Sequence, residues 1–106
     1  MEKIVLVAKV LSDANRVNIL ALLLRHNELC VCEICDTLQL SQPLVSRHLK
    51  QMKEANMICA RQEGRWMLYS INTADQTELT RCCLHEVQTT LHHLPKLIAC
   101  ERMSVH

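Results

Sequence analysis

The segment that follows Leu40 constrains the fold most, because it predicts one helix with clear start and stop signals. Ser41 is a good N-cap, and Pro43 falls in the first turn, where its missing N–H costs little. Asn56 tolerates the left-handed conformation in which many helices end. At about 100° per residue, the helix expected over 42–54 has one mainly apolar side and one polar side. The inner side carries Val45, His48, Leu49 and Met52, and the outer side carries Pro43, Ser46, Arg47, Lys50 and Glu54.

A shorter helix is predicted just before it, over 32–38, from the apolar pair Ile34 and Leu38. Two short helices joined by a tight turn, the second polar on its outside, are typical of a helix-turn-helix that binds the DNA major groove. We expect DNA contacts near the start of the second helix, where arginine reads guanine edges, glutamine reads adenine edges, and serine or lysine mostly contacts phosphate. The expected contact residues are Ser41, Gln42, Pro43, Ser46, Arg47 and Lys50, while the inward His48 is expected to be structural or to contact phosphate.

Three cysteines, Cys30, Cys32 and Cys35, form a thiol cluster at the start of this motif. Three thiolates suit a soft, three-coordinate centre such as As(III) or Sb(III). On a regular helix the first two would point about 160° apart and the last two about 60° apart, so the three sulfurs meet only if the chain leaves helical geometry. Metalloid binding should therefore distort the start of the helix-turn-helix. The alternative is that all three are small buried side chains, a common fate of free cysteines.

Length, charge and cysteine content restrict the class of protein. The 106 residues suffice for one domain with a core, and a single glycine favours a mostly helical structure. The net charge is only +1, but residues 41–65 hold five basic and two acidic side chains, a local net charge of +3 where DNA would bind. Seven cysteines, with no secretory signal and no apolar run that could span a membrane, predict a reduced, cytoplasmic protein.

Other elements are predicted on both sides of the helix-turn-helix. A β-hairpin is expected over 57–72, with arms 57–62 and 65–72 and with Gly64 supplying the turn. Helices are expected over 4–11, from an Asp13 cap to Leu24, and over 74–98 with a kink or break at Pro95. Their predicted apolar faces are Ile4, Val7, Ala8 and Leu11; Val17, Leu20, Ala21 and Leu24; and Leu79, Cys83, Val87, Leu91, Leu94 and Ile98.

The run E-L-C-V-C-x-x-C followed by S-Q-P-x-V-S-R-H-L resembles the ArsR/SmtB family of winged-helix repressors, particularly its arsenic-sensing ArsR members. The resemblance spans roughly residues 11–72, although Ala14 stands where many members have proline. It implies a mainly α fold with a small β-hairpin, in which residues 1–106 form a single winged helix-turn-helix domain. Residues 32–54 would be the helix-turn-helix and residues 57–72 the wing, with Arg61 and Arg65 near the DNA backbone or minor groove.

The same resemblance implies a dimeric repressor and not an enzyme. Dimerisation would use helices over 3–12 and 74–98, and a twofold homodimer suits a pseudo-palindromic operator. The repressor would leave its operator when As(III) or Sb(III) binds Cys30, Cys32 and Cys35, and so control an arsenic-resistance operon. No organic cofactor is expected.

Several alternatives stay open. The inducer could be Cd(II), Zn(II) or Pb(II), or the thiols could belong to an arsenic-handling enzyme. A thioredoxin-type site, however, would need a strand before Cys32, where the surroundings look helical. A purely dimeric interaction module fits poorly with the basic helix and hairpin. A second metal site in the tail lacks zinc-type ligand spacing; its candidate ligands are Cys82, Cys83, His85, Glu86, His92, His93 and Cys100.

Overall fold

The computed structural model describes residues 2–74, 77–91 and 93–99. Within these ranges the chain is mainly helical with one small antiparallel sheet, as predicted. No helix in the described ranges is long and apolar enough to cross a membrane. The helices are α1 (Glu2–Leu11), α2 (Ala14–His26), α3 (Val31–Leu38), α4 (Gln42–Glu54) and α5 (Glu78–Thr90), and the strands are β1 (Leu29–Cys30), β2 (Ile58–Glu63) and β3 (Trp66–Ile71).

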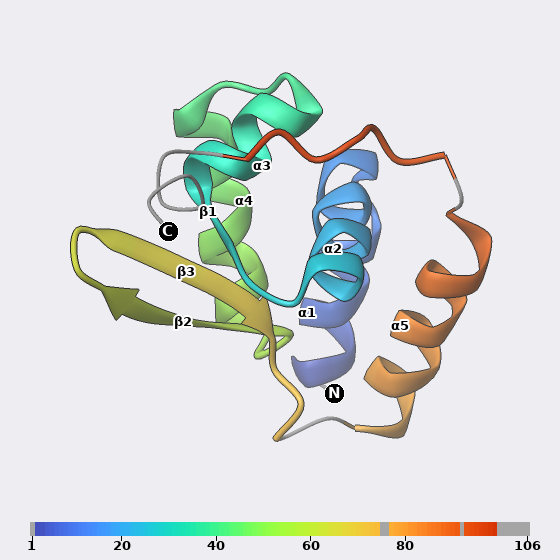
Figure 1. The fold of residues 1–106 in the computed structure, drawn as a ribbon. Coiled ribbons are helices and arrows are strands. Elements are labelled where there is room, and N and C mark those ends of the chain that lie inside the picture. Colours follow the sequence, from blue (N-terminus) through green and yellow to red (C-terminus); the bar gives the residue numbers. More distant parts are fainter. Residues whose placement is uncertain (1, 75–76, 92, 100–106) are drawn as a thin grey trace.

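Helix α2 forms the centre of the core. It packs against α1, α3, α4, α5 and β3, and the consecutive residues 19–23 are all buried. A helix that is apolar around so much of its circumference needs neighbours on several sides. In Figure 1, α5 flanks α2 on one side of the molecule, and the β2–β3 hairpin projects on the other. The remaining large, fully buried apolar side chains are Leu29, Ile34, Leu49, Met52, Met57, Ile58 and Leu68.

The predicted signals mark the start of α2 and both ends of α4 correctly, whereas α2 continues two residues beyond its predicted end at Leu24, to His26. The Asp13 carboxylate caps α2 by accepting the backbone N–H of Asn15 at 2.8 Å, and Ser41 caps α4 by accepting the N–H of Leu44 at 3.4 Å. Asn56, just after α4, is left-handed with φ 58°. Helix α4 covers the predicted residues, and all four side chains of its predicted inner side are buried: Val45, His48, Leu49 and Met52.

The predicted apolar face of α1 is partly wrong. The helix buries Val7 and Val10, whereas Ile4 is 58% exposed and Ala8 is also exposed. Spacings of three and four residues both occur in this short apolar sequence, so periodicity alone does not select the inner side. Packing of α1 against α2 and α4 selects it instead.

The predicted tail helix is too long. Helix α5 ends at Thr90, and residues 93–99 continue without helical structure. Pro95 cannot donate a hydrogen bond to the carbonyl of residue 91, and it disfavours a helical conformation at Leu94. The helix therefore stops before the proline and is not merely kinked by it. Leu94 and Leu97 still pack against the core from this non-helical segment.

The predicted hairpin forms, with its turn one residue later than expected. Glu63 pairs with Trp66, so Gly64 and Arg65 make a two-residue turn between β2 and β3. Gly64 has φ +60°, which fits the first position of a type II′ turn, and this confirms its predicted role.

The short strand β1 is an addition that the sequence pattern did not predict. It pairs with β3 in antiparallel fashion, placing Leu29 opposite Tyr69 and Cys30 opposite Leu68. The expectation that no strand precedes Cys32 is therefore wrong. A thioredoxin-type βαβ unit requires parallel strands, so this antiparallel pair still does not favour the redox-enzyme alternative.

Candidate nucleic-acid interface and thiol site

The outer side of α4 carries the residues predicted to contact DNA. They are all exposed: Ser41, Gln42, Pro43, Ser46, Arg47 and Lys50. The buried inner side anchors α4 against the core, so the polar side faces solvent on a fixed helix. This is the arrangement of a recognition helix in a helix-turn-helix. The individual DNA contacts stay a prediction.

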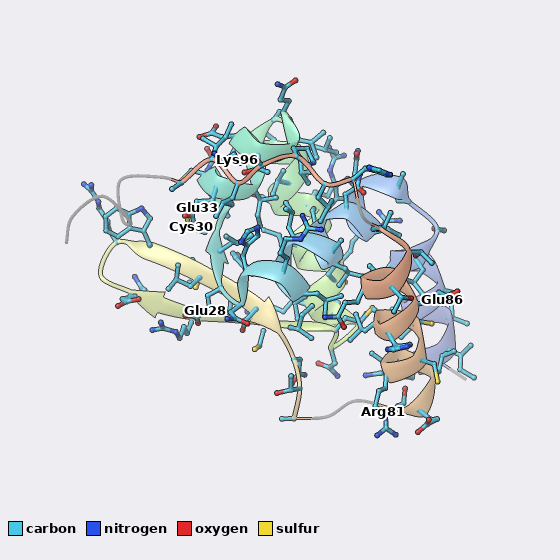
Figure 2. All side chains as sticks on the ribbon, turned by 45° about the vertical axis from the view of Figure 1, so that its right-hand side comes forward. Glu28, Cys30, Glu33, Arg81, Glu86 and Lys96 are labelled. Carbon is cyan, nitrogen blue, oxygen red and sulfur yellow. The ribbon has the colours of Figure 1, made fainter. Side chains whose placement is uncertain are left out.

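The two wing arginines differ in their surroundings. The Arg65 guanidinium lies over the Trp66 ring, 4.6 Å from its centroid. Arg61 donates hydrogen bonds to both carboxylate oxygens of Glu28, at 2.6 and 2.8 Å, and another to Glu63 at 3.1 Å. These bonds, first of all those to Glu28, hold the pKa of Arg61 above its usual range. Figure 2 shows Glu28 beside the hairpin that carries Arg61. Arg61 would therefore have to give up its ion pair with Glu28 to contact a DNA phosphate.

Arg16 is a positioning residue that the sequence reasoning missed. Its Nε and one terminal nitrogen donate to the last carbonyls of α1, at Val10 (3.1 Å) and Lys9 (2.6 Å). The other terminal nitrogen lies 3.2 Å from Nδ1 of His48 and donates to the Gln51 side chain at 2.8 Å. One guanidinium thus connects α1, α2 and the recognition helix. No spacing rule signals its link to the recognition helix, because His48 and Gln51 lie 32 and 35 positions away in the sequence.

His48 is buried, in agreement with a structural role. Its Nδ1 accepts a hydrogen bond from Arg16, and its buried Nε2 has no hydrogen-bond partner among the described residues. Burial lowers the pKa of His48, and Arg16 and Arg47 lower it further against the opposing effect of Asp13. The neutral imidazole is therefore the form that the folded protein favours.

The thiol cluster lies where β1 joins α3. Cys30 is the N-cap of α3 and is extended, with φ −89° and ψ 167°, while Cys32 and Cys35 lie within the helix. The Sγ atoms of Cys30 and Cys32 are 3.0 Å apart. The chain therefore already leaves helical geometry at Cys30, and this extended conformation brings these two sulfurs together. In the described ranges, however, no three His, Cys, Asp or Glu side chains gather as a metal site, so a three-sulfur site requires Cys35 to move.

The three thiols also differ in exposure. Cys30 is buried, Cys32 is exposed and Cys35 is half-buried. Partial burial raises the pKa of the Cys35 thiol, and the neighbouring Asp36 and Cys30 add to this effect. The donor chemistry fits a soft metalloid, and two of the three donors are already adjacent.

Glu33 is a second residue that the sequence reasoning missed. It is fully buried, and its Oε1 accepts the backbone N–H of Cys30 at 3.0 Å. Figure 2 shows the two residues together at the start of α3. This is a capping box with cysteine in place of serine or threonine, because the Cys30 side chain in turn faces the backbone N–H of Glu33. The signal C-x-x-E at a helix start was present in the sequence, but cysteine is not among the usual N-cap residues.

A second metal site in the tail does not assemble in the part of the chain that the structure describes. Cys82, His85 and Glu86 are exposed on α5, Cys83 is half-buried, and His93 follows beyond the helix. No three of the described metal-binding side chains gather there. His92 and Cys100 lie outside the described residues.

Comparison with known proteins agrees with these features. Residues 13–59 match the model of the family described as "Bacterial regulatory protein, arsR family". The arsenic resistance transcriptional regulator ArsR1 of Pseudomonas putida is 43% identical over 67 residues, which cover 63% of this chain and about half, 52%, of that relative. The arsenical resistance operon repressor of Escherichia coli is 34% identical over 95 residues, covering 83% of this chain and 81% of the repressor.

A solved structure resembles most of the fold. The homodimeric winged helix-turn-helix DNA-binding domain Mb0332 of Mycobacterium bovis superposes with a TM-score of 0.70 at 26% identity, covering 83% of this chain and 77% of that one. Its description as a possible ArsR-family regulator agrees with the family match. The chain therefore belongs to the ArsR family of transcriptional regulators, DNA-binding winged helix-turn-helix proteins that are not enzymes, and it is homologous to arsenical resistance repressors.

Proposed function

We propose that this protein is a homodimeric repressor that binds a pseudo-palindromic operator and leaves it when As(III) or Sb(III) binds Cys30, Cys32 and Cys35. The observation that carries the proposal is the pair of sulfurs 3.0 Å apart at the N-cap of α3, the helix that precedes the recognition helix. The regulated genes would be an arsenic-resistance operon, by analogy with the named relatives.

Exposed side chains support the dimeric DNA-binding part of the proposal. The polar face of α4 carries Arg47 and Lys50 toward solvent, where they can reach a groove or phosphates. On α1 and α5 the large apolar side chains of Ile4, Val5 and Leu79 are 58%, 50% and 42% exposed. Such side chains on two helices that both pack against α2 suit a self-complementary interface.

Cys30 can transmit ligand binding in two directions. As the N-cap of α3 it begins the helix-turn-helix, and as part of β1 it pairs with Leu68 in the wing. The Glu33 carboxylate accepts a hydrogen bond from the backbone N–H of Cys30, so a shift of Cys30 disturbs the first turn of α3 as well. A ligand that draws Cys35 toward Cys30 and Cys32 therefore strains the elements on either side of the DNA-binding surface.

The ligand chemistry requires no external base. Neutral arsenous acid has three hydroxides, and each thiol that forms an As–S bond transfers its proton to a departing hydroxide, which leaves as water. A raised pKa keeps Cys35 as a thiol at neutral pH, and this form can take part in the exchange. To change operator occupancy from nearly full to nearly empty, the ligand must favour the unbound state by roughly 5 kcal/mol.

A fluorescence-anisotropy titration tests the proposal. A labelled duplex from the promoter upstream of the coding sequence is saturated with protein, and arsenite, antimonite, cadmium or zinc is added. A phosphine reductant is used, since dithiol reductants themselves bind As(III). Release by the two trivalent metalloids is expected. Release by zinc or cadmium alone would overturn the choice of inducer.

Three variants locate the site. Cys32→Ser and Cys35→Ser should bind the duplex like the original protein but require at least about tenfold more arsenite for release, because a three-sulfur site has lost a donor. Cys82→Ser, an exposed thiol on α5, is the matched control and should behave like the original protein. An unchanged response of the first two variants would place the inducer site elsewhere.

A further inference from the structure

The segment after α5 crosses the molecule and ends against the thiol helix. Residues 93–99, which we call the strap, pass over α2 to α3, as Figure 1 shows. In Figure 2 the labelled Lys96 marks the strap where it crosses the helical body. The side chains of Leu94 and Leu97 are half-buried and pack against the core.

One hydrogen bond joins the strap directly to α3. The backbone N–H of Ile98 donates to the hydroxyl oxygen of Thr37 at 2.9 Å, across 61 positions of sequence. Thr37 is only 3% exposed, so this contact is shielded from water. A polar side chain that is buried needs such a partner, and here the strap supplies it. Thr37 lies two residues after Cys35, on the same short helix.

The strap is held by few interactions. It has no helical or strand hydrogen bonds, and His93, Pro95, Lys96 and Ile98 are exposed. Segments with few buried apolar contacts open locally at much lower free energy than the core. The docking of the strap should therefore depend strongly on the position of the helix that carries its anchor.

The thiols and the strap anchor share that helix. Cys35 packs against the core two residues before the anchor, whereas Cys30 and Cys32 are already adjacent at the start of α3. Drawing Cys35 toward the other two sulfurs changes the turn that leads into Thr37. We propose that the strap is a regulatory segment: it docks on α3 while no metalloid is bound to the thiols, and ligation of the thiols releases it. This inference rests on the proposed function of the thiol site.

The coupling must work in both directions. If ligation weakens docking, then weakening the docking must raise the affinity of the thiols for the ligand by the same factor. The strap would then set the sensitivity of the repressor. A variant that loosens the strap should respond to less arsenite than the original protein, although no ligand-binding group has changed.

Hydrogen exchange of the full chain, with and without arsenite, tests the proposal. Thr37→Val keeps the shape of the side chain but removes the acceptor for Ile98. It should speed hydrogen exchange of the strap amides about fivefold, the effect expected for the loss of one net hydrogen bond. The arsenite concentration that releases half of the bound DNA should fall by a similar factor. Thr89→Val on α5, which removes an exposed hydroxyl, is the matched control and should change neither quantity. Leu97→Ser, a change within the strap itself, is the second variant and should act like Thr37→Val.

The outcomes separate the two proposals. In the original protein arsenite should speed exchange of the strap, and Cys35→Ser should abolish this effect without altering the effect of Thr37→Val. If arsenite releases DNA while strap exchange is unchanged, the strap inference fails and the proposed function stands. If arsenite does not release DNA at all, the proposed function fails and the inference fails with it.

Discussion

Arg16 should contribute far more to stability than its position next to a helix cap suggests. Its guanidinium makes four hydrogen bonds, two of them part-buried and two exposed. A hydrogen bond from a charged donor contributes about 1.5–3 kcal/mol when buried and less when water competes. Allowing about 1 kcal/mol for each part-buried bond and less for the others, Arg16→Met should lower the free energy of unfolding by about 2–3 kcal/mol.

Urea denaturation followed by circular dichroism measures this loss, at one fixed protein concentration because the stability of the proposed dimer would depend on that concentration. Arg16→Lys keeps the charge but not the planar fork, so it should lose most of the same stability. Arg25→Met, an exposed arginine in the last turn of α2, is the matched control and should change stability by no more than about 0.5 kcal/mol.

A double-mutant cycle with Gln51→Ala isolates the link between α2 and the recognition helix, since both residues share one hydrogen bond. The coupling should be about 0.5–1 kcal/mol. The reasoning is refuted if Arg16→Met costs no more than Arg25→Met, because the four bonds would then add nothing beyond an exposed arginine.

Two further predictions concern pH and the hairpin turn. The pKa of His48 is lowered on folding, so below about pH 6.5 the unfolded chain binds a proton that the folded protein does not bind. The free energy of unfolding should therefore fall as the pH decreases through that range. His48→Gln should flatten this decline in urea denaturation measured from about pH 7.5 to 5.5, and an equally steep decline would contradict the assignment. Gly64→Ala should lower stability by about 1 kcal/mol through its left-handed backbone alone, because no atom lies within 4 Å of the added methyl group. Gly64→Asn should cost less, since asparagine tolerates that conformation; equal losses in both variants would argue against a backbone cause.

The recognition helix could be predicted in full because its signals are local. Ser41, Pro43 and Asn56 mark its ends within the segment itself, and the polarity of its two sides needs no knowledge of the partner elements. The hairpin follows for the same reason, since Gly64 fixes the turn locally. The one-residue shift of that turn reflects strand register, which the pairing of β2 with β3 decides.

The thiol geometry could not be predicted because it depends on a contact distant in the sequence. Cys30 is extended because it pairs with Leu68, and no residue near Cys30 in the sequence predicts that pairing. The three thiols could be identified from the sequence, but the directions in which their side chains point could not be predicted. The end of α5 was mispredicted for a related reason: the apolar residues Leu91, Leu94 and Ile98 continue the helical spacing, although the last two belong to the non-helical strap and Ile98 is exposed.

The ion pairs of Arg61 have a consequence for how salt should weaken operator binding. Each phosphate neutralised by a lysine or arginine releases close to one condensed counterion, and the number released sets the slope of log affinity against log salt. An arginine already balanced by Glu28 and Glu63 exchanges one anion for another and adds little to that number. The counterion release of this regulator should therefore come mainly from the recognition helix, with Arg61 acting as a nearly neutral part of the wing.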